Sequence, residues 1–254
     1  MSTYEIETST VLFPNGDLSI DAYLAQPTQS GSFPAVIVFQ EIFGVNDHIR
    51  DVTERIAREG YVAIAPALYQ RLAPGFEAGY TPEAIELGRA YKMQTKAEEL
   101  LGDTQAAIRY LRSLPAVDGA AIGTIGFCFG GHVAYLAATL PDIKATASFY
   151  GAGIATATPG GGPPTLSRTG DITGTVYAFF GDRDASIPAA EVAQIQDALS
   201  AHRIPHQIFR YPADHGFFCD RRGSYQPDAA ADAWQKALQL FQSALERQPQ
   251  AGLP

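Results

Sequence analysis

The sequence predicts an α/β fold with a mostly parallel central sheet that helices flank on both faces. From residue 34 onward, short apolar runs with a strand pattern alternate with longer runs of helical period. This alternation is typical of parallel strands that are joined by crossover helices. The chain has 254 residues, of which 46% are hydrophobic, and this suits one large α/β domain. We therefore expect a single domain over residues 1–254.

Eight segments have the composition of strands. The first two flank Asn15-Gly16, a dipeptide that favours tight hairpin turns, so we expect them to pair antiparallel. The third is apolar almost throughout (PAVIVFQ), which is typical of a strand buried on both faces. The predicted strands span residues 4–13, 18–26, 34–40, 61–68, 120–127, 145–150, 175–181 and 207–211.

Five segments have helical periodicity or capping signals. Asn46 or Asp47 can cap the first, and Thr81 followed by a proline is a typical start of the second. The second segment is long, and Gly102-Asp103 indicates a break in it. The predicted helices span about residues 46–60, 81–114, 132–140, 189–201 and 229–247.

Composition narrows the class of protein. The net charge of −9 and a pI near 5.0 argue against a nucleic-acid partner, which requires a basic face. The N-terminus is polar and acidic, and no apolar stretch is long enough to span a bilayer. Two cysteines are too few for a disulfide framework. We expect a cytoplasmic protein that binds neither nucleic acid nor membrane.

The hexapeptide at residues 126–131 (GFCFGG) is the strongest functional signal. It lies between a predicted strand and a predicted helix, and this order is that of the nucleophile elbow of α/β-hydrolases, with cysteine in place of serine. The N-terminus of the following helix would favour the reactive thiolate of Cys128. A buried structural cysteine beside ordinary turn glycines explains the hexapeptide equally well.

A base and an acid are therefore needed elsewhere in the chain. In α/β-hydrolases they follow the nucleophile in the order acid, base, and each lies after a strand. The strand at residues 175–181 leads to Asp182 and Asp184, and we choose Asp184, with Asp182 as the alternate. His215 follows the last strand and is the candidate base, because imidazole accepts and returns a proton near neutral pH. For the other histidines we expect surface or packing roles; they are His48, His132, His202 and His206.

Glu41 follows the buried strand at residues 34–40, where its carboxylate would lie over the nucleophile turn. If it is desolvated, it could exchange a proton with Cys128; alternatively it forms a structural ion pair with a nearby arginine. The same loop is expected to provide one backbone N–H of an oxyanion hole, at Ile42, and the residue after the nucleophile, Phe129, the other.

With these residues identified, the sequence resembles the dienelactone hydrolase (carboxymethylenebutenolidase) family over roughly residues 34–242. The motifs that carry the resemblance are residues 40–46 (QEIFGVN), 126–131 (GFCFGG), 149–151 (FYG), 184–188 (DASIP) and 215–217 (HGF). The resemblance implies a triad of Cys128, His215 and Asp184, with Glu41 as the partner of the resting thiol. It also implies opening of a small-molecule lactone through an acyl-enzyme, without a cofactor, and it aligns Tyr91 with a family active-site tyrosine.

The sequence departs from the family at two arginines that grip the substrate carboxylate. Cys219 and Leu87 occupy those positions; Arg221 and Arg222 lie close to the first but out of register, and Arg89 lies near the second. We take Tyr91, Arg89 and Arg221 as candidates for substrate binding.

The prediction is a cysteine hydrolase of small lactones or activated esters, as a monomer or weak homo-oligomer. Alternatives are a broader carboxylesterase or thioesterase on the same triad, or a catalytically idle binding protein. A metal site of Cys128, His215 and Cys219 lacks a fourth ligand, so we expect no metal and a packing or pocket-lining role for Cys219.

Overall fold

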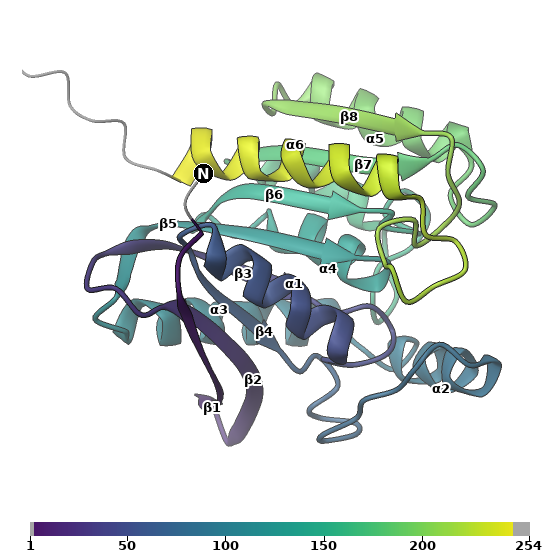
Figure 1. Ribbon diagram of the computed structural model, residues 1–254. Coiled ribbons are helices and arrows are strands. Elements are labelled where there is room, and N and C mark those ends of the chain that lie inside the picture. Colours follow the sequence, from purple (N-terminus) through teal and green to yellow (C-terminus); the bar gives the residue numbers. More distant parts are fainter. Residues whose placement is uncertain (1–2, 246–254) are drawn as a thin grey trace, which may run out of the picture.

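One eight-stranded sheet runs through the structure, a computed structural model that describes residues 3–245, with Ala120 described by its backbone alone (Figure 1). The strands are β1 (Ile6–Asn15), β2 (Leu18–Pro27), β3 (Phe33–Phe39), β4 (Val62–Pro66), β5 (Val117–Phe127), β6 (Ile143–Phe149), β7 (Thr175–Gly181) and β8 (His206–Tyr211). Their order is β1-β2-β4-β3-β5-β6-β7-β8. The pairs β1–β2 and β2–β4 are antiparallel, and the other neighbours are parallel. The predicted mostly parallel sheet is confirmed.

Helices cover both faces of the sheet, as the sequence predicts. In Figure 1, α1 and α6 lie in front of the sheet, whereas α3, α4 and α5 lie behind it. The helices are α1 (Asp47–Arg58), α2 (Pro82–Lys92), α3 (Ala97–Ser113), α4 (Phe129–Ala137), α5 (Ala189–Ala201) and α6 (Pro227–Leu245), with a 3₁₀-helix, η1 (Thr165–Asp171). The predicted continuation of α6 to residue 247 lies outside the described residues. Within residues 3–245, no helix has both the length and the apolar composition that crossing a bilayer requires.

The hairpin at the start of the chain is confirmed. The strands β1 and β2 pair antiparallel from Ile6 opposite Pro27 to Asn15 opposite Leu18. Gly16 in the turn has a φ of 62°, a left-handed conformation that glycine adopts without steric cost. This ribbon extends the sheet beyond β4, away from the strands that lead to the candidate site.

The predicted helix break near Gly102-Asp103 was wrong. The helix α2 ends at Lys92 and α3 begins at Ala97, and α3 then continues through Gly102 and Asp103. Aspartate disfavours helices when its side chain competes for the helix backbone. Here the Asp103 carboxylate is instead bound from outside the helix, by the side chains of Asn15 and Arg71.

Replacing Asp103 by alanine is expected to lower the free energy of unfolding by about 2–3 kcal/mol. Its carboxylate is 1% exposed, accepts a 2.7 Å hydrogen bond from Asn15 Nδ2 and pairs with both terminal nitrogens of Arg71. Urea unfolding measures the loss, and Asp197→Ala on the exposed face of α5 is the control. A loss below about 1 kcal/mol would contradict a stabilising role.

The carboxyl ends of the parallel strands share one edge of the sheet. The register pairs Phe39 with Gly126, Phe127 with Phe149, and Gly181 with Tyr211, so the strands end at the same level. In Figure 1 this edge lies on the right, where the arrowheads of β5 to β8 point. The residues that follow these strands gather there, and among them are Glu41, Cys128, Tyr150, Asp184 and His215.

Candidate active site

The turn that carries Cys128 joins β5 directly to α4. Cys128 is the N-cap of α4, with φ 55° and ψ −115°. A positive φ is uncommon for a residue other than glycine, and a strained strand-to-helix turn of this kind exposes the nucleophile of α/β-hydrolases. The thiol is partly exposed and lies at the N-terminus of a helix, where the dipole favours a negative charge.

Two glycines of the hexapeptide are required by close backbone contacts. A Cβ on Gly126 would lie 1.9 Å from the carbonyl oxygen of Gly130, and a Cβ on Gly130 would lie 2.2 Å from that of Phe39. The turn is also tied to β6, because the Cys128 N–H donates to the Phe149 carbonyl at 3.0 Å. The glycines thus let the turn pack tightly between β3 and β6.

Cys128, His215 and Asp184 lie together at this edge of the sheet. The imidazole Nδ1 lies 2.6 Å from Asp184 Oδ2, and the Cys128 sulfur is close enough to the ring that each group shifts the pKa of the other. Asp184 Oδ1 accepts from the Ser186 N–H at 2.9 Å and from the Ser186 hydroxyl at 2.5 Å. The alternate acid, Asp182, pairs instead with Arg210 at the surface, at 2.6 Å. The structure therefore brings Asp184, and not Asp182, to the imidazole.

The pair of Cys128 and His215 favours the thiolate–imidazolium form. Burial alone would raise the pKa of Cys128, but the imidazolium charge and its hydrogen bond lower it below the usual value. Burial likewise opposes the charge on His215, yet Cys128 and Asp184 raise the pKa of the imidazole to about 10. The coupling therefore increases the thiolate fraction of Cys128 at a given pH and favours a proton on the imidazole.

Alkylation by iodoacetamide is expected to distinguish the two cysteines. Only the thiolate reacts, so the lowered pKa of Cys128 moves the midpoint of its pH–rate curve below pH 9. Burial raises the pKa of Cys219 to about 11, so this fully buried thiol is expected to react slowly at the same pH. Peptide mass spectrometry over a pH series measures both rates. Equal rates at pH 7.5 would contradict the ion pair.

Glu41 forms the ion pair that the sequence left open as an alternative to proton exchange with Cys128. Its carboxylate is fully buried, and Oε1 accepts from Arg222 Nη1 at 2.9 Å. The Arg222 guanidinium passes over Gly216, and a Cβ on that glycine would lie 2.4 Å from Arg222 Nη1. The same guanidinium lies 5.8 Å from the centre of the Tyr80 ring. The glycine after His215 therefore makes room for an arginine that balances the buried charge of Glu41.

Comparison with known proteins identifies the family. The sequence model of the dienelactone hydrolase family matches residues 20–245. The chain belongs to the dienelactone hydrolase family. A Synechocystis protein named "Putative carboxymethylenebutenolidase" is 60% identical over 245 residues, which cover 96% of this chain and 100% of that protein. A Bradyrhizobium protein named "Probable 2-oxo-3-(5-oxofuran-2-ylidene)propanoate lactonase" is 33% identical over 232 residues, 88% of this chain and 89% of that protein.

Solved structures agree with this family. The crystal structure named "Putative Dienelactone Hydrolase" from Klebsiella pneumoniae superimposes with a TM-score of 0.85 at 33% identity, over 93% of this chain and 98% of the other. The predicted α/β-hydrolase fold and the resemblance to dienelactone hydrolases are therefore confirmed. The chain is a dienelactone hydrolase-like enzyme of the carboxylic ester hydrolase class.

Of the two expected backbone donors, Phe129 follows Cys128 directly and Ile42 lies in the loop after β3. Phe129 is the first residue of α4, and the first N–H groups of a helix have no partner within that helix. Ile42 follows Glu41 in the buried loop after β3, and its carbonyl oxygen would lie 2.2 Å from a Cβ on Gly88 of α2. The helix α2 therefore packs directly on the backbone of this loop at Ile42. Its role as an oxyanion donor stays a prediction.

The three candidate substrate-binding residues are dispersed. Tyr91 packs against Tyr69, with ring centres 5.6 Å apart, and Tyr69 stacks on Phe129 at 5.9 Å, so Tyr91 reaches the nucleophile turn through one ring. Arg89 lies exposed on α2. Arg221 is also exposed and lies 3.5 Å from Asp220, whereas its neighbour reaches Glu41. Of these three, only Tyr91 connects to the nucleophile turn through packed side chains.

A cavity of about 470 Å³ lies beside the turn that carries Cys128. Its walls are the end of α2, the start of α4 and the glycine-rich loop at residues 156–162. Lys92 and Phe129 both line it, and Lys92 Nζ lies 5.9 Å from the centre of the Phe129 ring. The Lys92 charge also contributes to the lowered pKa of Cys128, after the larger effects of burial and of His215. The loop that the sequence predicts at the rim therefore forms one wall of this cavity.

Sequence reasoning missed three neighbours of the triad. Arg222 was discounted as out of register, and Lys92 was not singled out. Tyr150 appeared only as the centre of the FYG motif; its ring lies 5.1 Å from the His215 ring, and its buried hydroxyl has no hydrogen-bond partner within residues 3–245. The available signal for Tyr150 was its position directly after β6, at the carboxyl edge of the sheet.

Proposed function

We propose that the protein hydrolyses small lactones or activated esters with Cys128 as the nucleophile and an acyl-thioester as the intermediate. The observation that supports this most directly is the 2.6 Å contact of His215 with Asp184, beside a Cys128 sulfur whose pKa the same imidazole lowers. A nucleophile, a base and an orienting carboxylate in this arrangement are the requirements of covalent catalysis. The alternative of an idle binding protein gives no reason for a strained cysteine turn.

Each step uses groups at the carboxyl edge of the sheet. The Cys128 sulfur bonds to the ester or lactone carbonyl carbon, and the N–H groups of Phe129 and Ile42 would receive the oxyanion. The C–O bond then breaks, and His215 gives its proton to the leaving oxygen, which stays attached to the acyl group when a lactone ring opens. Water next attacks the thioester, His215 takes a proton from it, and the C–S bond breaks. The acid leaves, and the thiolate–imidazolium pair is restored.

A negatively charged substrate suits the cavity beside Phe129. Lys92 is the cationic side chain that lines this cavity, which also borders the first turn of α4. An anionic group of the substrate in the cavity would approach Lys92 while its reacting carbonyl meets Cys128. The lactonase name of the Bradyrhizobium relative agrees with a lactone substrate.

Replacing Lys92 by methionine is expected to raise KM for a carboxylated lactone roughly tenfold, since a hydrogen bond to a charged group contributes about 1.5–3 kcal/mol. The same change is expected to alter kcat/KM for neutral p-nitrophenyl acetate less than about threefold. Steady-state kinetics on the two substrates measures the difference. The matched control is Lys144→Met near the start of β6, at the opposite edge of the sheet. Equal effects on both substrates would contradict charge recognition.

A broader esterase or thioesterase on the same triad is the second candidate. The family positions for the two carboxylate-gripping arginines hold Leu87, which is exposed on α2, and Cys219, which is buried and bonded to Tyr80. Neither side chain binds a carboxylate. This favours substrates that do not need the two arginines with which family members grip a carboxylate.

A substrate panel tests the proposal. Wild type and Cys128→Ala would be assayed against a carboxylated dienelactone, neutral lactones, p-nitrophenyl esters and acyl thioesters. Highest kcat/KM on lactones supports the first candidate, and highest kcat/KM on thioesters or simple esters supports the second. If Cys128→Ala matches wild type on every substrate that is turned over, the cysteine mechanism is wrong.

A further inference from the structure

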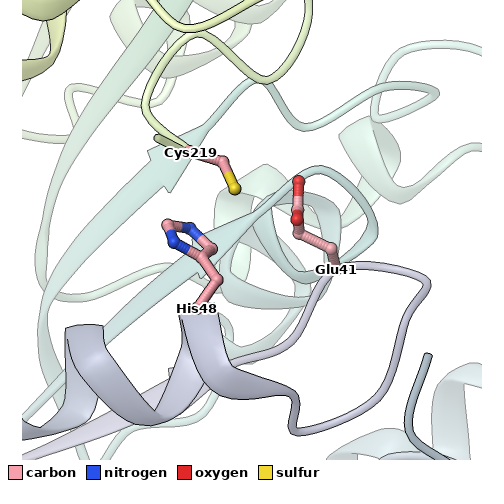
Figure 2. A group of neighbouring side chains, drawn as sticks. All are labelled: Glu41, His48 and Cys219. Atoms are coloured by element: carbon pink, nitrogen blue, oxygen red, sulfur yellow. The ribbon is translucent and has the colours of Figure 1, made fainter. Parts of the chain in front are cut away.

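Three buried side chains outside the triad meet in one group. Glu41 comes from the loop after β3, His48 from the first turn of α1, and Cys219 from the loop after β8, and Figure 2 shows their polar ends turned toward a common point. One ligand atom from each lies within 4.8 Å of the other two. The exposed fractions of the three residues are 0%, 3% and 0%. The sequence alone does not indicate this group, because the residues are far apart in the chain.

Two polar atoms of the group have no hydrogen-bond partner among residues 3–245. Glu41 Oε2 and His48 Nε2 are both buried, and neither makes a hydrogen bond with any part of the chain that the structure describes. A buried polar atom without a partner costs on the order of 1–3 kcal/mol, more for a charged group. Arg222 satisfies only the other carboxylate oxygen of Glu41. One carboxylate oxygen and one imidazole nitrogen of the group therefore both lack a hydrogen-bond partner among the described residues.

The surroundings of the group favour a metal ion that accepts a sulfur ligand together with nitrogen and oxygen ligands. The His48 ring packs edge-on against Phe127 and Phe218, at 5.8 and 6.2 Å between centres, so two aromatic rings wall one side of the group. Cys219 Sγ lies 3.2 Å from the hydroxyl of Tyr80. One sulfur, one ring nitrogen and one carboxylate oxygen thus converge, with a phenol oxygen beside them.

We propose that Glu41, His48 and Cys219 bind a zinc ion. Zinc takes thiolate, imidazole and carboxylate ligands in tetrahedral sites, whereas calcium and magnesium prefer oxygen alone. Tyr80 Oη or a water molecule would complete the tetrahedron. Cys219 loses its thiol proton to solvent on binding, so the thiolate and the Glu41 carboxylate together balance the two charges of the ion. Bond lengths of about 2.0–2.3 Å place tetrahedral ligands about 3.3–3.8 Å apart, so the group needs only a small contraction.

The group lies near the surface on the side of His48. This side chain lines one surface pocket with Asp47, Glu77 and Tyr80, and a second one with Asp220. Arg221 also lines the first pocket and Arg55 the second, so both pockets carry charges of both signs. A metal ion would therefore approach the group past the imidazole, because Glu41 and Cys219 are fully buried.

The test measures zinc binding in a Cys128→Ala background, because zinc would otherwise also bind the Cys128–His215 pair. Competition with a chromophoric chelator gives stoichiometry and affinity, and cobalt substitution reports thiolate ligation by a charge-transfer band in the near ultraviolet. We expect one equivalent of zinc to bind, with a cobalt–thiolate band from Cys219, the one remaining thiol. The double variant Cys128→Ala/Cys219→Ser is expected to lose the band and to bind zinc at least about 100-fold more weakly.

A second double variant tests whether a loss of zinc binding is caused by unfolding. Cys128→Ala/His48→Gln keeps a polar side chain at residue 48, and its melting temperature with chelator present reports folding independently of zinc. Added zinc is expected to raise the melting temperature of Cys128→Ala and to leave both double variants almost unchanged. Three results would overturn the proposal: no zinc binding by folded Cys128→Ala at micromolar concentration, no thiolate band with cobalt, or undiminished affinity in the Cys219→Ser double variant. The first of these would mean that a water molecule alone occupies the group.

Discussion

Replacement of Cys128 by alanine is expected to lower kcat/KM for a lactone or an activated ester by about 10⁴-fold or more. The Cys128 sulfur is the only protein atom that forms a covalent bond with the substrate in the proposed mechanism, so without it the acyl-thioester does not form. The backbone N–H groups of Phe129 and Ile42 remain, and they account for whatever rate above that in water persists. Steady-state kinetics measures the loss, with a thermal melt to show that the variant is folded.

Serine at residue 128 is a sharper form of the same prediction. It preserves the shape of the turn, yet a hydroxyl needs stronger help from the base than a thiol does, so most activity is expected to disappear. The control is Ser113→Ala at the end of α3, which is expected to stay within about twofold of wild type. Mass spectrometry of quenched reactions adds an independent readout, since wild type is expected to carry the acyl mass on the peptide with Cys128. Substantial turnover by Cys128→Ala would mean that another group is the nucleophile.

The grouping of Cys128, Asp184 and His215 could be predicted from the sequence because parallel strands end at one edge of a sheet. Cys128, Asp184 and His215 each follow a strand-like run, and their order matches the connectivity of the fold. The structure joins the three side chains through contacts between residues that are far apart in the chain, such as the 2.6 Å contact of His215 with Asp184. Chain order and strand topology thus determine which residues meet, although they give no distances.

The neighbours of the triad could not be predicted in the same way. Glu41 and Arg222 are 181 residues apart, and the arginine reaches the carboxylate only because the loop after His215 folds back across Gly216. No periodic pattern records such a contact, since loops follow neither a helical nor a strand period. His48 shows the same limit: at the start of α1 it resembles a surface residue, and only packing between α1 and the loop after β8 buries it beside Cys219.

Local signals failed where tertiary contacts decide the structure. Gly102-Asp103 resembles a helix break, yet Asn15 and Arg71 hold the Asp103 carboxylate outside the backbone of α3. The helix after the nucleophile turn begins at Phe129, three residues before the predicted start at His132. The glycines there disfavour a helix by propensity, but the close packing against β3 and β6 requires them.

Asp184→Asn is expected to lower kcat/KM by about 10²–10⁴-fold, and His215→Ala by about 10² or more. The carboxylate accepts the Nδ1 proton of His215 and so leaves the other ring nitrogen for the thiol. An amide removes the negative charge that raises the pKa of the imidazole, and the weaker imidazolium in turn stabilises the Cys128 thiolate less. The loss therefore acts through both groups of the ion pair.

The pH dependence of Asp184→Asn separates this role from a purely structural one. In wild type, kcat/KM rises as Cys128 loses its proton, at a pH below the ordinary thiol value, and falls as His215 loses its proton near pH 10. In Asp184→Asn the acid limb is expected to move to higher pH and the alkaline limb to lower pH, so that the profile narrows from both sides. The matched control is Asp182→Asn, two residues away, whose carboxylate pairs with Arg210 at the surface. This control is expected to retain activity within about twofold and to keep the wild-type profile. If instead Asp182→Asn lost activity and Asp184→Asn kept both activity and profile, the acid of the triad would be Asp182, and the contact seen between His215 and Asp184 would have no part in the reaction.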